Sequence, residues 1–215
     1  MQNRNGFTLV ELAIALMVIG LLIGGVLKGQ ELIENARMTR TIKDINDYDT
    51  AVMMFRNTYN GIPGDFKYPR RLPNCNTNPC QIAGLGDGLV NIPSEILNFW
   101  VHLYYAGLIS NVNETGHQFN TSPINAYGGR THILFTIHFA VPAAHRYFVT
   151  DNEHVIPAPG LLTLSRAKAL DSKMDDGNPA TGRVTTTLCN DPDTMDYTLN
   201  DSRFCDLGIK SDVME

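Results

Sequence analysis

Residues 7–27 read FTLVELAIALMVIGLLIGGVL, an apolar run of 21 residues with a single charged side chain, Glu11. As an α-helix this run spans about 31 Å, which matches the ~30 Å hydrocarbon core of a bilayer. Backbone polar groups in lipid must be paired internally, so the run has to be helical. Arg4 precedes it and Lys28 follows it, and the charge bias around the run favours a cytoplasmic N-terminus. We therefore predict a single membrane-spanning helix at residues 7–27, with the rest of the chain outside.

A second apolar pattern continues from the first. Seven residues recur at spacings of three or four and form one stripe on a helix: Met38, Ile42, Ile45, Tyr48, Val52, Phe55 and Tyr59. Asn60-Gly61 and Pro63-Gly64 then end the helical pattern. We predict one helix over residues 7–60, about 80 Å long. Its amphipathic second part, residues 28–60, is expected to pack on the globular part of the same chain.

Residues 61–215 predict a globular head that combines helices and strands. After a loop at 61–93, the patterns indicate helices at 94–106 and near 164–174, and strands at 131–139, 146–150 and 183–189. In the strand at 131–139, alternation places His132 and His138 on the polar face. The predicted fold class is α+β: a long N-terminal spine helix, its first half transmembrane, packed on a C-terminal head with an antiparallel sheet.

Four cysteines form two groups along the chain, Cys75 with Cys80 and Cys189 with Cys205. An even number in an exported chain indicates disulfides, and four cysteines allow three connectivities. Zinc is the alternative, but zinc ligands normally come as closely spaced cysteine pairs or with nearby histidines. Fifteen residues separate Cys189 from Cys205, and the six histidines cluster with neither pair. We expect two disulfides between sequence neighbours.

The charge distribution excludes several function classes. The formal net charge is −5, and residues 171–215 alone carry ten acidic and four basic side chains. An acidic chain is a poor ligand for phosphate backbones, so no nucleic-acid partner is expected. The sequence contains neither G-x-S-x-G nor H-E-x-x-H, and no enzymatic activity and no organic cofactor are expected.

The N-terminal stretch also resembles a known family. Gly6-Phe7-Thr8-Leu9-Val10-Glu11, followed at once by the apolar helix, is similar to the start of type IV pilins and type II secretion pseudopilins. In that family a leader ending in glycine precedes Phe-Thr-Leu-(Val/Ile)-Glu. Several head segments are also similar to bacterial prepilin-type proteins, among them Gly61-Ile-Pro-Gly-Asp65 and Gly86-Asp-Gly88.

The resemblance implies a processing and assembly pathway. Prepilin peptidase would remove the leader, residues 1–6, by cutting between Gly6 and Phe7, and would methylate the new Phe7 amine. Glu11 would pair with the N-terminal amine of a neighbouring subunit during assembly. The alternative for Glu11 is a carboxylate that reaches the membrane boundary without a partner.

The same resemblance implies a structural role: a minor pilin or pseudopilin in a type IV pilus or type II secretion filament. Its partners would be the peptidase, other subunits of this kind and the inner membrane, and its head would be periplasmic before reaching a filament or the cell surface. The alternative is a pilus-tip or competence-type module that binds an external ligand. Because major pseudopilins can bind Ca²⁺ in a C-terminal loop, three carboxylates are calcium candidates, against a solvated acidic surface: Asp191, Asp193 and Asp196.

Overall fold

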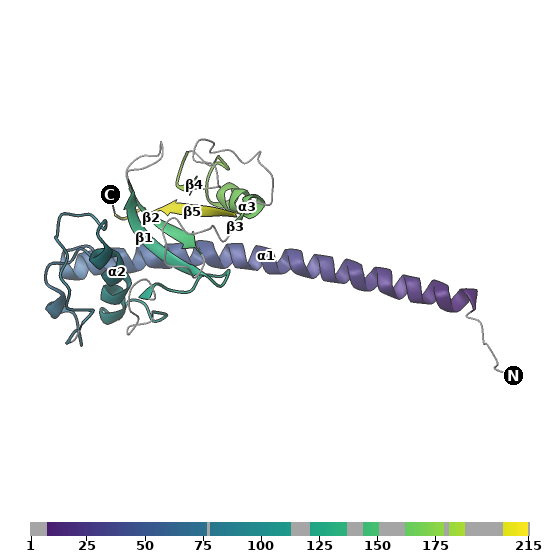
Figure 1. The fold of residues 1–215 in the computed structure, drawn as a ribbon, viewed down its shortest axis with the longest axis horizontal. Coiled ribbons are helices and arrows are strands. Elements are labelled where there is room, and N and C mark those ends of the chain that lie inside the picture. Colours follow the sequence, from purple (N-terminus) through teal and green to yellow (C-terminus); the bar gives the residue numbers. More distant parts are fainter. Residues whose placement is uncertain are drawn as a thin grey trace. The chain divides into compact units, whose positions relative to one another are not determined.

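The fold is described from a computed structural model at residues 8–76, 78–112, 121–136, 144–150, 162–178, 181–187 and 204–214. The chain forms two compact units, Met1–Arg40 and Thr41–Glu215, and α1 (Leu9–Tyr59) contributes to both. The other elements, labelled in Figure 1 apart from a short 3₁₀ turn at Pro69–Arg71, are α2 (Pro93–Tyr105), β1 (Arg130–Thr136), β2 (Ala144–Thr150), β3 (Leu162–Thr163), α3 (Leu164–Met174), β4 (Val184–Thr187) and β5 (Phe204–Lys210). The α+β fold class predicted from the sequence is confirmed.

Helix α1 ends where the sequence predicts. Within the second unit its apolar stripe is buried, and Ile45, Val52 and Phe55 have no exposed surface. The last helical residue is Tyr59, and Asn60 follows with φ of +55°. Asparagine is one of the few residues that adopts this left-handed conformation readily, so it is suited to ending a helix.

The sheet is antiparallel, with strand order β1-β2-β5-β4. Strand β5 lies between β2 and β4, since Ile209 is opposite both Tyr147 and Val184. The two-residue strand β3 pairs with the start of β5. The last element of the chain therefore holds the sheet together.

An aromatic cluster forms the centre of the second unit. The single tryptophan, Trp100 on α2, is fully buried, and its ring centroid lies 4.9 Å from those of Tyr48 on α1 and Phe99. Tyr147 on β2 lies 6.2 Å from Trp100 on the same measure. Large buried aromatic rings stabilise a core strongly, and here they join α1, α2 and the sheet.

One sequence prediction needs correction, and two strands, β3 and β5, were not predicted. His132 was predicted on a polar strand face, yet it is 2% exposed and its Nδ1 lies 2.9 Å from Ser122 Oγ. The segment around Ser122 covers that face, so β1 is buried on both sides at this position. His138 lies outside the described residues.

Candidate functional site

The first functional feature of the chain is the exposed apolar stretch of helix α1. By length and composition it could span a membrane, and its most apolar stretch is fully exposed within the chain itself. Leu9, Leu16 and Leu21 are between 68% and 85% exposed. A surface of this size and polarity requires lipid or other protein around it.

The start of α1 is fixed by a reciprocal capping arrangement between Thr8 and Glu11. Glu11 Oε2 accepts hydrogen bonds from the Thr8 backbone N–H at 2.9 Å and from the Thr8 hydroxyl at 2.8 Å. The Glu11 backbone N–H in turn donates to Thr8 Oγ1 at 3.3 Å. This is the Thr-x-x-Glu capping box, which pairs N–H groups that a helix start leaves unsatisfied.

Glu11 was expected either to pair with a neighbouring subunit or to reach the membrane boundary, and a capping role for Thr8 was not predicted. The signal was present, since Thr8 and Glu11 have the spacing of a capping box immediately before an apolar run. Gly6 and Phe7, the residues of the expected cleavage junction, lie outside the described part of the chain. Their roles stay predictions.

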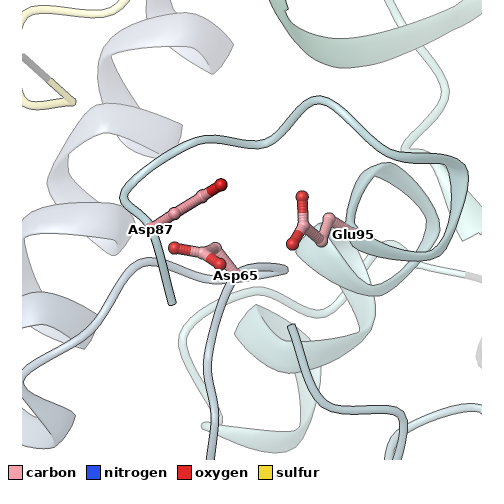
Figure 2. A group of neighbouring side chains, drawn as sticks. All are labelled: Asp65, Asp87 and Glu95. Atoms are coloured by element: carbon pink, nitrogen blue, oxygen red, sulfur yellow. The ribbon is translucent and has the colours of Figure 1, made fainter. Parts of the chain in front are cut away.

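In the head, the buried carboxylate of Asp65 holds the glycine-rich segment of the loop before α2 (Figure 2). Asp65 is 3% exposed and accepts the backbone N–H of Gly86 and, at 2.7 Å, that of Gly88. Gly86 and Gly88 have φ values of +67° and +89°, which glycine adopts without a steric penalty. Charge-assisted bonds of this kind are among the stronger hydrogen bonds in proteins.

Glu95 fixes the two ends of the same loop. Its side chain is fully buried, with Oε1 accepting the Leu85 N–H at 3.0 Å and Oε2 accepting the Asn91 N–H at 3.3 Å. Because Glu95 lies in the first turn of α2, the helix start and the loop are held by one side chain. Residues 85–91 are thus anchored through their backbone.

Two groups of carboxylates among the described residues are close enough to share a cation. Within each group, one oxygen per residue lies within 4.8 Å of the others: Asp65, Asp87 and Glu95 (Figure 2), and Asp171, Asp175 and Asp176. In the first group Asp65 and Glu95 accept the loop amides described above, and Asp87 Oδ1 accepts the N–H of Leu89 at 2.9 Å. In the second, Asp175 accepts the N–H groups of Arg183 and Val184, and Asp176 accepts the Thr181 hydroxyl at 2.6 Å. These contacts make both groups structural anchors.

The calcium candidates Asp191, Asp193 and Asp196 lie outside the described residues, as does Cys189. A calcium site in that segment and a Cys189–Cys205 bridge therefore stay predictions.

A disulfide joins Cys75 and Cys80, one of the two neighbouring pairs expected from the sequence. His102 links this bridge to the loop that follows α1. Its Nε2–H donates to the Cys80 carbonyl at 3.2 Å, and its Nδ1 accepts the Gly64 N–H at 3.0 Å. Burial lowers the pKa of His102 to about 4, only partly opposed by the bond to Cys80. A neutral imidazole is thus built into the head.

Asp49 on α1 is the main polar contact between the helix and the sheet. It is 7% exposed, and its carboxylate accepts the Tyr147 hydroxyl at 3.0 Å and pairs with Arg183 at 2.9 Å. Burial, followed by the charge of Asp49, raises the pKa of Tyr147 well above its usual value. Arg183 also contacts Asp212 at 3.1 Å, so the network extends to the C-terminal segment.

Comparison with known proteins identifies the N-terminal segment. Residues 1–27 match the prokaryotic N-terminal methylation motif, the prepilin-type signature of type IV pilins and pseudopilins. No curated protein and no solved structure matches the chain. The motif supports a type IV pilin-like or pseudopilin-like subunit, and together with the apolar part of α1 it fits anchoring in the inner membrane.

Proposed function

We propose that the chain is a prepilin whose mature form is a structural, non-enzymatic subunit, a minor pilin or pseudopilin, of a type IV pilus or type II secretion filament. The observation that carries this proposal is the methylation motif at residues 1–27, joined to an apolar helix with one carboxylate near its start. The head would lie in the periplasm, an oxidising compartment that suits the Cys75–Cys80 disulfide.

Processing would take place at the cytoplasmic end of α1. Prepilin peptidase would cut the amide bond between Gly6 and Phe7 and methylate the Phe7 amine that this exposes. The Thr8–Glu11 capping box supports this role, because it starts the helix two residues after the junction. The mature N-terminus would then stand directly beside a defined helix end.

Assembly would use the carboxylate of Glu11. Within one chain Glu11 accepts two hydrogen bonds, both from Thr8 and both at Oε2. In a filament core the Phe7 amine of a neighbouring subunit would pair with Glu11. An unpaired charge in such a low-dielectric core costs several kcal/mol, so pairing would favour subunits in register.

The test is the mass of the mature chain. Protein from peptidase-positive cells should lack residues 1–6 and carry one N-methyl group on Phe7, whereas protein from peptidase-negative cells should retain the leader. Gly6→Val should block cleavage, and Asn5→Ala, a change at the adjacent leader residue, serves as the matched control. A mature start anywhere other than Phe7, or normal cleavage of Gly6→Val, would overturn the proposal.

A further inference from the structure

The C-terminal turn at residues 211–214 is held at both ends by His145 of β2. The Ser211 N–H donates to the His145 carbonyl at 2.9 Å, and His145 Nδ1–H donates to the Met214 carbonyl at 2.7 Å. Ser211 is 1% exposed and Met214 is 3% exposed. His145 therefore holds this turn against the start of β2, at one end through its backbone carbonyl and at the other through its ring.

Helix α1 holds the middle of the turn. Asp49 accepts the Ser211 hydroxyl at 2.6 Å and the Asp212 N–H at 3.2 Å, and Arg56 donates to the Val213 carbonyl. Among the described residues the strand pairing of β5 ends at Lys210. Apart from the Ser211 N–H, which donates to the backbone carbonyl of His145, the turn is thus held by side chains rather than by a strand ladder.

The other ring nitrogen of His145 holds a third segment. Nε2 lies 3.2 Å from the backbone nitrogen of Val90, whose N–H is the donor. The Val90 carbonyl accepts the N–H of Phe135 at 2.9 Å, which attaches the loop before α2 to β1. Since the Val90 N–H can only donate and the Met214 carbonyl can only accept, this arrangement requires a neutral His145 with its proton on Nδ1.

A second proton on His145 would oppose this arrangement. It would occupy Nε2 and place two donors, the ring N–H and the Val90 N–H, against each other. Among the described residues, the charged groups that act on the ring are Asp65, which favours the cation, and Arg56 of α1, which opposes it, while β1 contributes the neutral Phe135 ring at 5.0 Å. Burial is the largest influence and lowers the pKa of His145, so the neutral ring is favoured at neutral pH.

We propose that His145 is an acid-sensitive latch, whose protonation releases the C-terminal turn 211–214 and the Val90 segment while the sheet remains folded. Regions held without ladder pairing open at a lower free energy than sheet strands, so release is local. The turn also borders an open cavity of about 600 Å³ lined by Arg56, Asn60, Asp212 and Val213 among others, which release would enlarge. The latch belongs to the head alone and does not depend on the filament role.

The test is hydrogen exchange of the full-length mature chain in detergent micelles. Between about pH 7.5 and about pH 5, corrected for intrinsic rates, exchange of residues 211–214 should accelerate about tenfold or more through local opening of the turn. Amides of β1, β2 and α2 should stay more strongly protected than the turn and follow only the global stability of the head. His145→Asn keeps a donor near the Nδ1 position without titrating and should abolish this pH dependence. His132→Asn, at another buried histidine, on the adjacent strand β1, should leave it intact.

An equal pH effect in wild type and His145→Asn would overturn the latch, as would loss of protection spread evenly over the head. If His145→Asn does not fold, nuclear magnetic resonance of the wild-type ring decides the question. The latch requires the Nδ1–H tautomer at neutral pH, and ring protonation must share its midpoint with the opening of residues 211–214. An Nε2–H tautomer, or two separate midpoints, would refute it.

Discussion

Replacing His102 with glutamine should make the head less sensitive to acid, although it should also lower its stability at neutral pH. In the folded head His102 is neutral, with one nitrogen accepting the Gly64 N–H and the other donating to the Cys80 carbonyl. Glutamine can still donate from a position near Nε2, but it does not titrate. The variant therefore removes the proton equilibrium while it retains part of the hydrogen bonding.

The expected magnitude follows from the pKa of His102, about 4 in the folded head against 6.5 in the unfolded chain. Above pH 6.5 both states are neutral and the histidine contributes no pH dependence. As the pH falls below 6.5 the unfolded chain binds a proton that the folded head excludes, so the free energy of unfolding decreases. The loss is about 2 kcal/mol at pH 5 and approaches roughly 3 kcal/mol below pH 4.

The single tryptophan offers a direct assay. Trp100 is fully buried on α2, two residues before His102, so its fluorescence reports unfolding of this region. Urea unfolding of the full mature chain in micelles, with the disulfide intact, should be measured at about pH 7.5 and about pH 5. With an m-value of about 2 kcal/mol per molar urea, the contribution of His102 corresponds to a shift of about 1 M in the midpoint.

The decisive quantity is how much more free energy of unfolding the wild type loses on acidification than His102→Gln does. Wild type should lose about 2 kcal/mol more than His102→Gln on acidification, because all other titrating groups are common to both proteins. Equal losses in the two proteins would show that His102 is not held neutral by the fold. A larger loss of unfolding free energy in His102→Gln than in wild type would also contradict the prediction.

Three further changes test other contacts. Glu11→Ala should leave membrane insertion and head folding intact but reduce recovery in sheared filaments, measured against membrane levels; equal recovery would remove its assembly role. Replacing Cys75 and Cys80 together by serine should lower the free energy of unfolding of the head by about 2 kcal/mol in urea titration, the entropy of closing a short loop, and no change would contradict this. Asp49→Ala should cost about 3 kcal/mol in the same assay, because it leaves Arg183 without its most buried partner; a loss below about 1 kcal/mol would show that solvent screens the pair.

The part of the fold that local pattern controls could be predicted from the sequence. Helix α1 has an uninterrupted apolar run followed by a stripe of period 3.6, and both signals lie within the segment they describe. Strand β5 carries no such signal, because its sequence FCDLGIK includes Asp206, Gly208 and Lys210. It becomes a strand through pairing with β2, which lies far away in the sequence, and with the preceding strand β4.

The candidate sites also divide into those that lie within one stretch of sequence and those that only the tertiary fold brings together. The methylation motif and the Cys75–Cys80 pair are contiguous or nearly so, and the sequence was sufficient to identify them. The contact of Asp65 with Gly86 and Gly88 joins residues more than twenty positions apart, and nothing in either segment indicates its partner. His145 likewise acquires its contacts from the chain end and from the loop before α2, so only the tertiary fold reveals them.

In the loop anchored by Asp65 and Glu95, the backbone conformation does not depend on the identity of the exposed apolar side chains. Its shape is set mainly through backbone N–H groups and by the positive φ of Gly86 and Gly88. Within the anchored segment, Asp87 also accepts the Leu89 N–H and Val90 is buried, but exposed apolar side chains take no part in the bonds that hold the loop. Leu85 is 57% exposed, and nearby Ile82 is 39% exposed. Changes at these two positions can alter what the head displays without altering how it folds. The head thus has a rigid frame on which surface chemistry can diversify, whether through natural sequence drift or through deliberate grafting of a recognition sequence.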